Sequence, residues 1–170
     1  MNAITAETAT LDARVQALVA LFERIAATRM QGVPMLHEAL RVVAVGFEAD
    51  PAGDGAVGVL VTPWFMNLVW LPLHDEAPAL AVGSRRVRQV GAEAFEFIGA
   101  CEDDVGAFEA CSLFSPMNDF ADQAAALATA QAALDHLRRP PAAASAPRPE
   151  PVVALPPRRA FLLGAGRAER

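Results

Sequence analysis

The sequence has no lysine and no tyrosine, and it is poor in metal-binding side chains. Only two cysteines and three histidines occur among its 170 residues. Two cysteines cannot build a disulfide framework. Without a Cys-x-x-Cys pair or closely spaced histidines, the ligands of a structural zinc or rubredoxin-type iron site are missing. We therefore expect no metal site and no cofactor.

The sequence also lacks a long apolar run. No segment reaches the ~18 consecutive apolar residues that cross a bilayer. Residues 1–15 show neither the basic start nor the apolar stretch of an export signal. We expect a cytoplasmic protein without stable membrane insertion.

All the basic residues are arginines, and they are unevenly distributed. Residues 1–137 carry seven arginines and 18 acidic residues, a net charge of -11, whereas residues 138–170 carry seven arginines and two acidic residues, a net charge of +5. An overall charge of -6 argues against nucleic acid or an anionic membrane as the partner. An acidic body is suited to a basic partner.

The length corresponds to about one domain. Apolar residues at steps of three and four predict a helix over residues 10–31, capped by Thr8 or Thr10. A second helix is predicted over residues 118–137, capped by Asn118 or Asp119. The Pro/Ala-rich segment 140–157 reads as an extended linker. The predicted organisation is a domain at 1–139, this linker, and a basic and apolar segment at 158–170.

Between the helices the pattern predicts extended segments joined by turns. They lie at residues 41–48, 57–62, 64–71, 85–90, 94–101 and 107–114. Residues 64–71 would also suit a short helix, although the flanking prolines favour an extended chain. Residues 85–90 alternate charge and valine as a half-exposed strand does, and Phe95, Phe97 and Phe108 are candidates for cross-strand core pairs. The predicted fold is α+β, an antiparallel sheet of about five strands with both helices on one face.

Three stretches depart from what such a sheet requires. Trp64, Phe65 and Met66 are adjacent, so a strand cannot turn all three toward one core; they are either buried on both faces or form part of a groove. Cys111 lies beside a serine, but no histidine is near it to act as base, which favours a structural thiol over a nucleophile. A disulfide between Cys101 and Cys111 is disfavoured because the two are out of register across the predicted turn.

The third stretch runs from Arg158 to Gly164. Its two arginines, a spacer, phenylalanine and leucine are like a twin-arginine export signal, but its position after the predicted domain is wrong for one. The alternative is an additional edge strand.

These same stretches resemble the HybE family, also called HupJ, of [NiFe]-hydrogenase assembly proteins. The residues that carry the resemblance are Val61-Thr62-Pro63-Trp64-Phe65-Met66, Cys111-Ser112-Leu113-Phe114-Ser115-Pro116-Met117 and Arg158-Arg159-Ala160-Phe161-Leu162-Leu163-Gly164. The resemblance implies a cytoplasmic chaperone that binds the hydrogenase small-subunit precursor through its twin-arginine signal and delays export. The large subunit and other maturation proteins are further expected partners. Iron binding does not carry over, because the Cys-x-x-Cys pairs of rubredoxin-like members are missing.

From this resemblance we predict a partner-binding set and no catalytic residues. The set comprises Pro63, Trp64, Phe65, Met66, Asn67, Cys111, Ser112, Phe114, Ser115, Met117, Arg158, Arg159 and Phe161. Trp64, Phe65, Met66, Phe114 and Met117 are expected to line a groove for the signal's apolar segment.

We further hypothesise that Arg158–Leu163 mimics that signal and occupies the groove when no client is bound. The alternatives are an assembly scaffold that contacts other maturation factors without binding the signal, and a small cysteine-dependent enzyme.

Overall fold

The computed structural model describes residues 3–50, 54–74, 77 and 79–139. They form an antiparallel sheet and two helices. The elements are α1 (Ala3–Ala27), β1 (Val43–Ala49), β2 (Gly55–Val61), β3 (Met66–Pro72), β4 (Arg85–Val90), β5 (Glu93–Glu102), β6 (Gly106–Phe114) and α2 (Gln123–Arg138). The α+β class and the antiparallel sheet predicted from the sequence are confirmed. The sheet has six strands, because the ambiguous segment that follows Phe65 is strand β3.

The strand order is β1-β2-β3-β6-β5-β4, and every neighbouring pair is antiparallel. Consecutive strands form the hairpins β1–β2, β2–β3, β4–β5 and β5–β6. The long-range pairing of β3 with β6 joins the two halves of the sheet. This pairing brings sequence segments about 45 residues apart next to each other.

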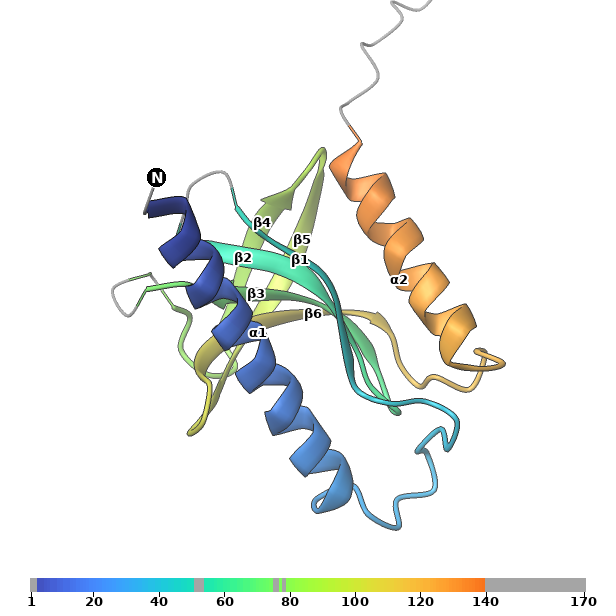
Figure 1. The fold of residues 1–170 in the computed structure, drawn as a ribbon. Helices are drawn as coiled ribbons and strands as arrows, with labels where there is room; N and C mark the ends of the chain where they lie inside the picture. The colour runs from blue at the N-terminus through green and yellow to red at the C-terminus, as the bar shows by residue number, and fades with distance from the viewer. Residues whose placement is uncertain (1–2, 51–53, 75–76, 78, 140–170) are drawn as a thin grey trace, which may run out of the picture. The chain divides into compact units, whose positions relative to one another are not determined.

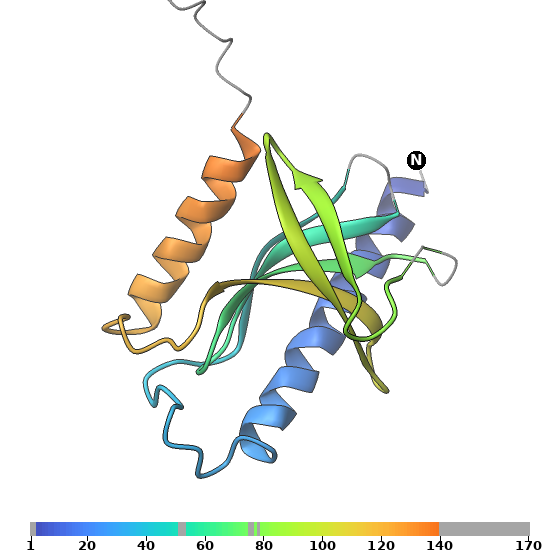
Figure 2. The ribbon, with the colours of Figure 1, turned by 180° about the vertical axis from the view of Figure 1, so that it is seen from behind.

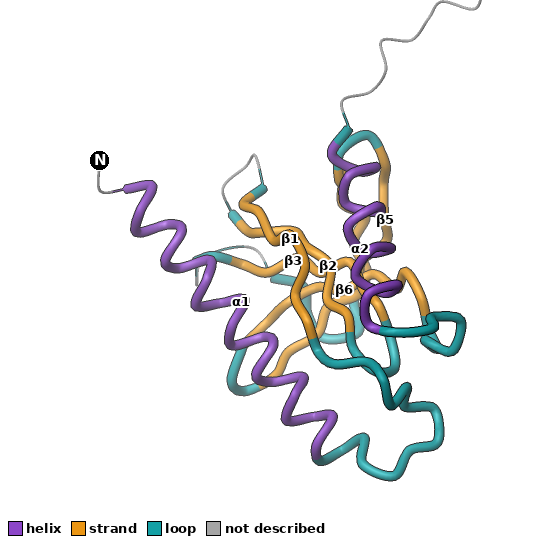
Figure 3. The backbone as a smooth tube through the Cα atoms, turned by 45° about the vertical axis from the view of Figure 1, so that its right-hand side comes forward, coloured by secondary structure: helices purple, strands orange, loops and turns teal. Residues whose placement is uncertain are grey.

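The two helices cover opposite faces of the sheet, so the prediction that both lie on one face was wrong. Alternate residues of a strand point to opposite faces, and in β2 the side chains of Val59 and Val61 pack with α2, whereas Leu60 packs with α1. Figure 1 shows α1 in front of the strands, Figure 2 shows it behind them, and Figure 3 shows the strands between the two helices. The cause is that β2 and β3 are apolar on both faces, and each face needs a cover.

The helix boundaries differ from those predicted. α1 begins at Ala3, earlier than expected, and buries Leu18, Leu21, Phe22 and Ile25. The cap of α2 is Asp122, whose side chain accepts a hydrogen bond of 2.8 Å from the Ala125 amide. The predicted caps Asn118 and Asp119 instead lie in the preceding loop. Neither helix of the described residues is both long and apolar enough to cross a bilayer.

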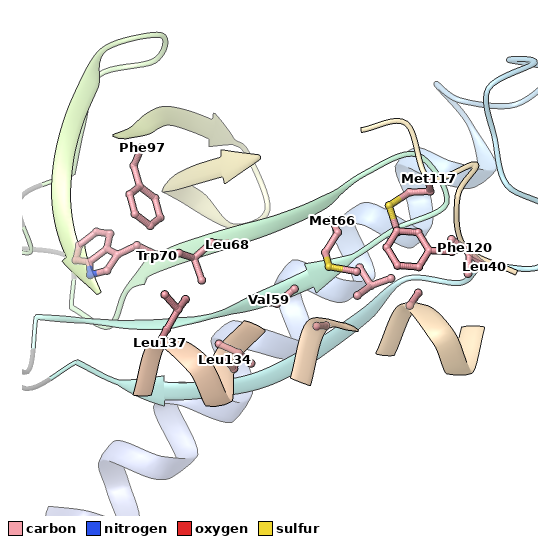
Figure 4. Close-up of a cluster of buried hydrophobic side chains, with 13 residues drawn as sticks. Leu40, Val59, Met66, Leu68, Trp70, Phe97, Met117, Phe120, Leu134 and Leu137 are labelled. Atoms are coloured by element: carbon pink, nitrogen blue, oxygen red, sulfur yellow. The ribbon is translucent and has the colours of Figure 1, made fainter. Parts of the chain in front are cut away.

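The core on the α2 face is built around large side chains with almost no exposed surface. Figure 4 shows Met66, Met117 and Phe120 at one end of this cluster and Trp70 and Phe97 at the other. The predicted pairing of Phe108 with Phe95 and Phe97 was wrong. Phe108 packs on the α1 face, because it lies opposite Ala100 and not opposite either phenylalanine.

Candidate partner-binding site

The tertiary fold brings together the two motif segments that suggested a binding site. In the ladder between β3 and β6, Met66 lies opposite Phe114, Asn67 opposite Ser112, and Leu68 opposite Cys111. A register shift lies between the first two pairs. The Ser115 hydroxyl donates a hydrogen bond of 3.4 Å to the Trp64 carbonyl. The two motifs are therefore one structural unit at one end of the sheet.

The turn from Thr62 to Phe65 is held by the side chain of the buried Thr62. Its hydroxyl accepts hydrogen bonds from the Trp64 amide (3.3 Å) and the Phe65 amide (3.0 Å), and it donates one to the Phe65 carbonyl at 3.0 Å. The carbonyl of Pro63 accepts a hydrogen bond of 2.8 Å from the His37 amide. Thr62 and the buried Pro63 thus fix the backbone between β2 and β3 and position the aromatic residues that follow.

The five side chains expected to line one groove are divided between the two faces of the domain. Trp64 and Phe65 are half-buried against Phe22 of α1, with ring centroids 6.3 and 5.5 Å from it. Met66 and Met117 have no exposed surface and belong to the core on the α2 face. The two methionines therefore do not line a surface groove, which corrects that part of the prediction.

The exposed members of the set come mainly from the second motif. Phe114 is 40% exposed, and its ring meets that of Phe120 edge-on at 5.2 Å. Ser112 and Ser115 are also exposed. Asn67 is half-buried, and its side-chain oxygen has no hydrogen-bond partner among the described residues. Phe114, Ser112 and Ser115 are therefore the described members of the set that are exposed at this end of the sheet.

Cys111 is a half-buried thiol that packs against the α2-face core. Burial raises the pKa of the Cys111 thiol, and the negative charge of Glu96 raises it further. A catalytic cysteine needs the opposite shift. Cys101 is also free, as the register argument predicted. No cluster of metal-ligating side chains is present in the part of the chain that the structure describes. The remaining members of the predicted set, Arg158, Arg159 and Phe161, lie outside the described residues.

An ion pair between Arg88 of β4 and the buried Glu109 of β6 was not predicted from the sequence. The carboxylate of Glu109 is fully buried and accepts two hydrogen bonds from Arg88, from Nε (2.6 Å) and Nη2 (2.8 Å). The Arg86 guanidinium lies 3.5 Å from the same carboxylate. Arg88 also stacks on the Trp70 ring, 3.7 Å from its centroid, and the Trp70 indole nitrogen donates to Asp50 at 3.0 Å. The one available signal was the charge alternation of β4, in which Arg86 and Arg88 turn inward.

Part of the acidity of residues 1–137 is neutralised within the domain. Arg24 of α1 pairs with Asp104, and Arg29, in the turn that follows α1, pairs with Glu102 at 2.7 Å, so the end of the helix is tied to the β5–β6 hairpin. The hydrogen bond from Arg29 lowers the pKa of Glu102.

Comparisons with known proteins agree with one another. The sequence profile of the family described as "[NiFe]-hydrogenase assembly, chaperone, HybE" matches residues 13–164. "Protein HoxT" of Cupriavidus necator is 46% identical over 166 residues, which cover 92% of this chain and 91% of that protein. "Hydrogenase expression/formation protein HupJ" of Bradyrhizobium diazoefficiens is 40% identical over 148 residues, 86% of this chain and 85% of that protein.

A likeness in fold accompanies these sequence matches. The solution structure of HybE from Escherichia coli superposes with a TM-score of 0.59. It covers 91% of each chain at 24% sequence identity. The two chains share a fold.

Proposed function

Because the chain belongs to the HybE family of [NiFe]-hydrogenase assembly chaperones, we propose that it binds the small-subunit precursor of such a hydrogenase through the precursor's twin-arginine signal. The binding takes place in the cytoplasm, before export. In this proposal the large subunit and other maturation proteins are further partners, and neither nucleic acid nor the membrane is one.

The charge of the folded domain carries this proposal. Most arginines of residues 1–137 are engaged internally, since Arg24, Arg29, Arg85, Arg86 and Arg88 all form ion pairs. Acidic residues outnumber arginines by eleven in this part of the chain. A surface of this kind attracts a basic peptide, with an association rate that falls as salt rises.

The paired motifs supply a contact surface in this proposal. Phe114, Ser112 and Ser115 contact the client, with half-buried Trp64, Phe65, Asn67 and Cys111 beside them. The buried side chains Pro63, Met66 and Met117 hold that surface in place. Arg158, Arg159 and Phe161 act as a competitor for the client's signal.

The proposal predicts which client is retained in a binding assay. The full chain is immobilised and offered the small-subunit precursor with its signal, the same subunit without the signal, and a precursor whose two signal arginines are replaced by glutamine. We expect the intact precursor to bind and the other two to bind at least tenfold more weakly, with the difference shrinking at high salt. Equal retention of all three would favour the alternative of an assembly scaffold that does not bind the signal.

A further inference from the structure

A groove runs between α1 and β1, away from the motif residues. Two adjoining hollows of about 370 and 390 Å³ share the lining residues Val15, Gln16 and Ala44. The first extends to Asp12 of α1, and the second extends to Glu23. We call the combined feature the α1–β1 groove.

The floor of the α1–β1 groove is apolar. Leu11 and Phe47 line it near Asp12, and Val19 and Val42 line it near Glu23. Leu11, Val15 and Val19 are only half-buried, because they flank the stripe of α1 that packs into the core. Apolar surface is thus available to a ligand along about three turns of the helix.

One wall of the groove is an edge strand. β1 pairs with β2 on one side and, within the described sheet, has no strand on its other side. Arg138 donates to the Gly46 carbonyl and forms an ion pair with Glu48 at 2.9 Å, which occupies the second half of the strand. The groove is bordered by Val43 and Ala44 at the start of the strand, with Val42 just before it, and it reaches Gly46 and Phe47. An exposed strand edge is a template for an added extended segment.

The charges of the groove select the kind of segment. Asp12 and Glu23 are its only charged lining residues, both are exposed, and neither forms an ion pair with another described residue. They are eleven positions apart on α1, which places them on one face of the helix about 16 Å apart. An extended chain covers this distance in about five residues. The adjacent arginines of a twin-arginine segment can pair with one of these carboxylates, and the apolar residues that follow then lie along the floor toward the other.

We propose that the α1–β1 groove binds the arginine-containing, apolar stretch of the small-subunit signal as an added strand beside β1. This inference rests on the proposed function and gives it a location. The Glu23 end of the groove adjoins the motif turn, because Val43 lies opposite Val61 and Phe22 contacts Trp64. A signal bound here therefore leads directly toward the exposed motif residues.

A charge-reversal pair tests the proposal. The full chain is titrated into a fluorescent synthetic peptide of the small-subunit signal at moderate salt. We expect Asp12→Arg with Glu23→Arg to weaken binding at least tenfold. The matched control is Asp119→Arg with Asp135→Arg, which changes net charge equally at exposed positions on the α2 side and is expected to weaken binding less than threefold. Equal losses in the two variants would overturn the location, since they would reflect net charge alone.

Hydrogen exchange supplies a measurement that does not depend on any substitution. With the signal peptide bound, we expect some backbone amides of residues 43–45 to exchange at least tenfold more slowly, because an added strand bonds the outward-facing amides of an edge. The other edge strand, β4, is the internal control and is expected to be unchanged. Protection of β4 instead of β1 would contradict the proposal.

The results of these experiments distinguish a wrong location for the binding site from a wrong proposed function. If the wild-type chain does not bind the signal peptide at all, the proposed function is wrong and the inference falls with it. If the peptide binds but the groove variant and the β1 amides behave like their controls, only the location is wrong. A wild-type dimer that the groove substitutions convert to a monomer, with signal affinity unchanged, would assign the groove to a second copy of the chain.

Discussion

Glu109 is the one charged residue of the described chain that is fully buried. Its carboxylate is completely buried, and Arg88, only 17% exposed at its side chain, meets it with two hydrogen bonds. On β4, Arg86 and Arg88 therefore face inward, whereas Val87 is 67% exposed and lies on the outer face with Arg85. This inverts the usual preference of a half-exposed strand. A buried charge requires a partner, and this requirement outweighs the small gain from burying one valine.

Breaking this pair on one side is expected to be costly. We predict that Glu109→Leu lowers the free energy of unfolding by about 3 kcal/mol, since it leaves the guanidinium of Arg88 without its carboxylate. The double variant with Arg88→Met is expected to recover at least half of the loss, because the more deeply buried of the two guanidiniums that face Glu109 is then removed together with the carboxylate. Urea unfolding of the three proteins measures both effects. An additive loss in the double variant would show that packing, and not the unpaired charge, is responsible.

At the scale of the elements, the turn between β4 and β5 determines how closely α2 can approach the sheet. Gly91 in this turn has φ +61°, and a Cβ built on it lies 1.6 Å from the Leu137 carbonyl oxygen. Only glycine allows both the backbone conformation and this contact. The end of α2 therefore rests on the β4–β5 hairpin because of a single missing side chain.

Gly91→Ala is expected to destabilise the domain more than the same change at Gly106. Gly106 has a similar φ of +75°, but a Cβ there meets nothing within 4 Å. We predict a loss of about 1 kcal/mol for Gly106→Ala, from the backbone conformation alone, and of about 3 kcal/mol or more for Gly91→Ala, which adds a steric overlap with backbone. Chemical denaturation of the two variants gives the comparison. Equal losses would mean that α2 shifts away at little cost.

At the scale of the whole molecule, the division of charge is the feature that links the chain to its proposed client. The acidic domain is suited to a basic peptide, and the basic segment at 158–170 contains a sequence like that peptide. This segment lies outside the described residues, so the hypothesis of a built-in competitor rests on the sequence.

Removal of residues 156–170 tests the competitor. If Arg158–Leu163 competes with the client, the shortened chain is expected to bind the signal peptide several-fold more tightly than the full chain, because a covalently attached ligand is present at high effective concentration. Arg158→Gln with Arg159→Gln in the full chain serves as the milder variant and is expected to shift affinity in the same direction. Unchanged or weaker binding in the shortened chain would eliminate the competitor.

Much of the local structure was predictable from the sequence. The two helices and the strands were located to within a few residues, except at the starts of both helices, because local periodicity and turn residues determine them. The motif segments were likewise found from the residues themselves. Their adjacency was not, since the pairing of Met66 with Phe114 is a long-range contact that no local pattern encodes.

By itself, the sequence determined the class of fold, the acidic character of the domain and the segments that mark its family. The tertiary structure alone decided which side chains face each other. It placed the helices on opposite faces, since two apolar sheet faces both require cover. It buried Met66 and Met117 in the core and turned Arg88 inward to Glu109. It also left the α1–β1 groove open along an edge strand, because packing partners depend on register and layer order and not on neighbouring residues in the chain.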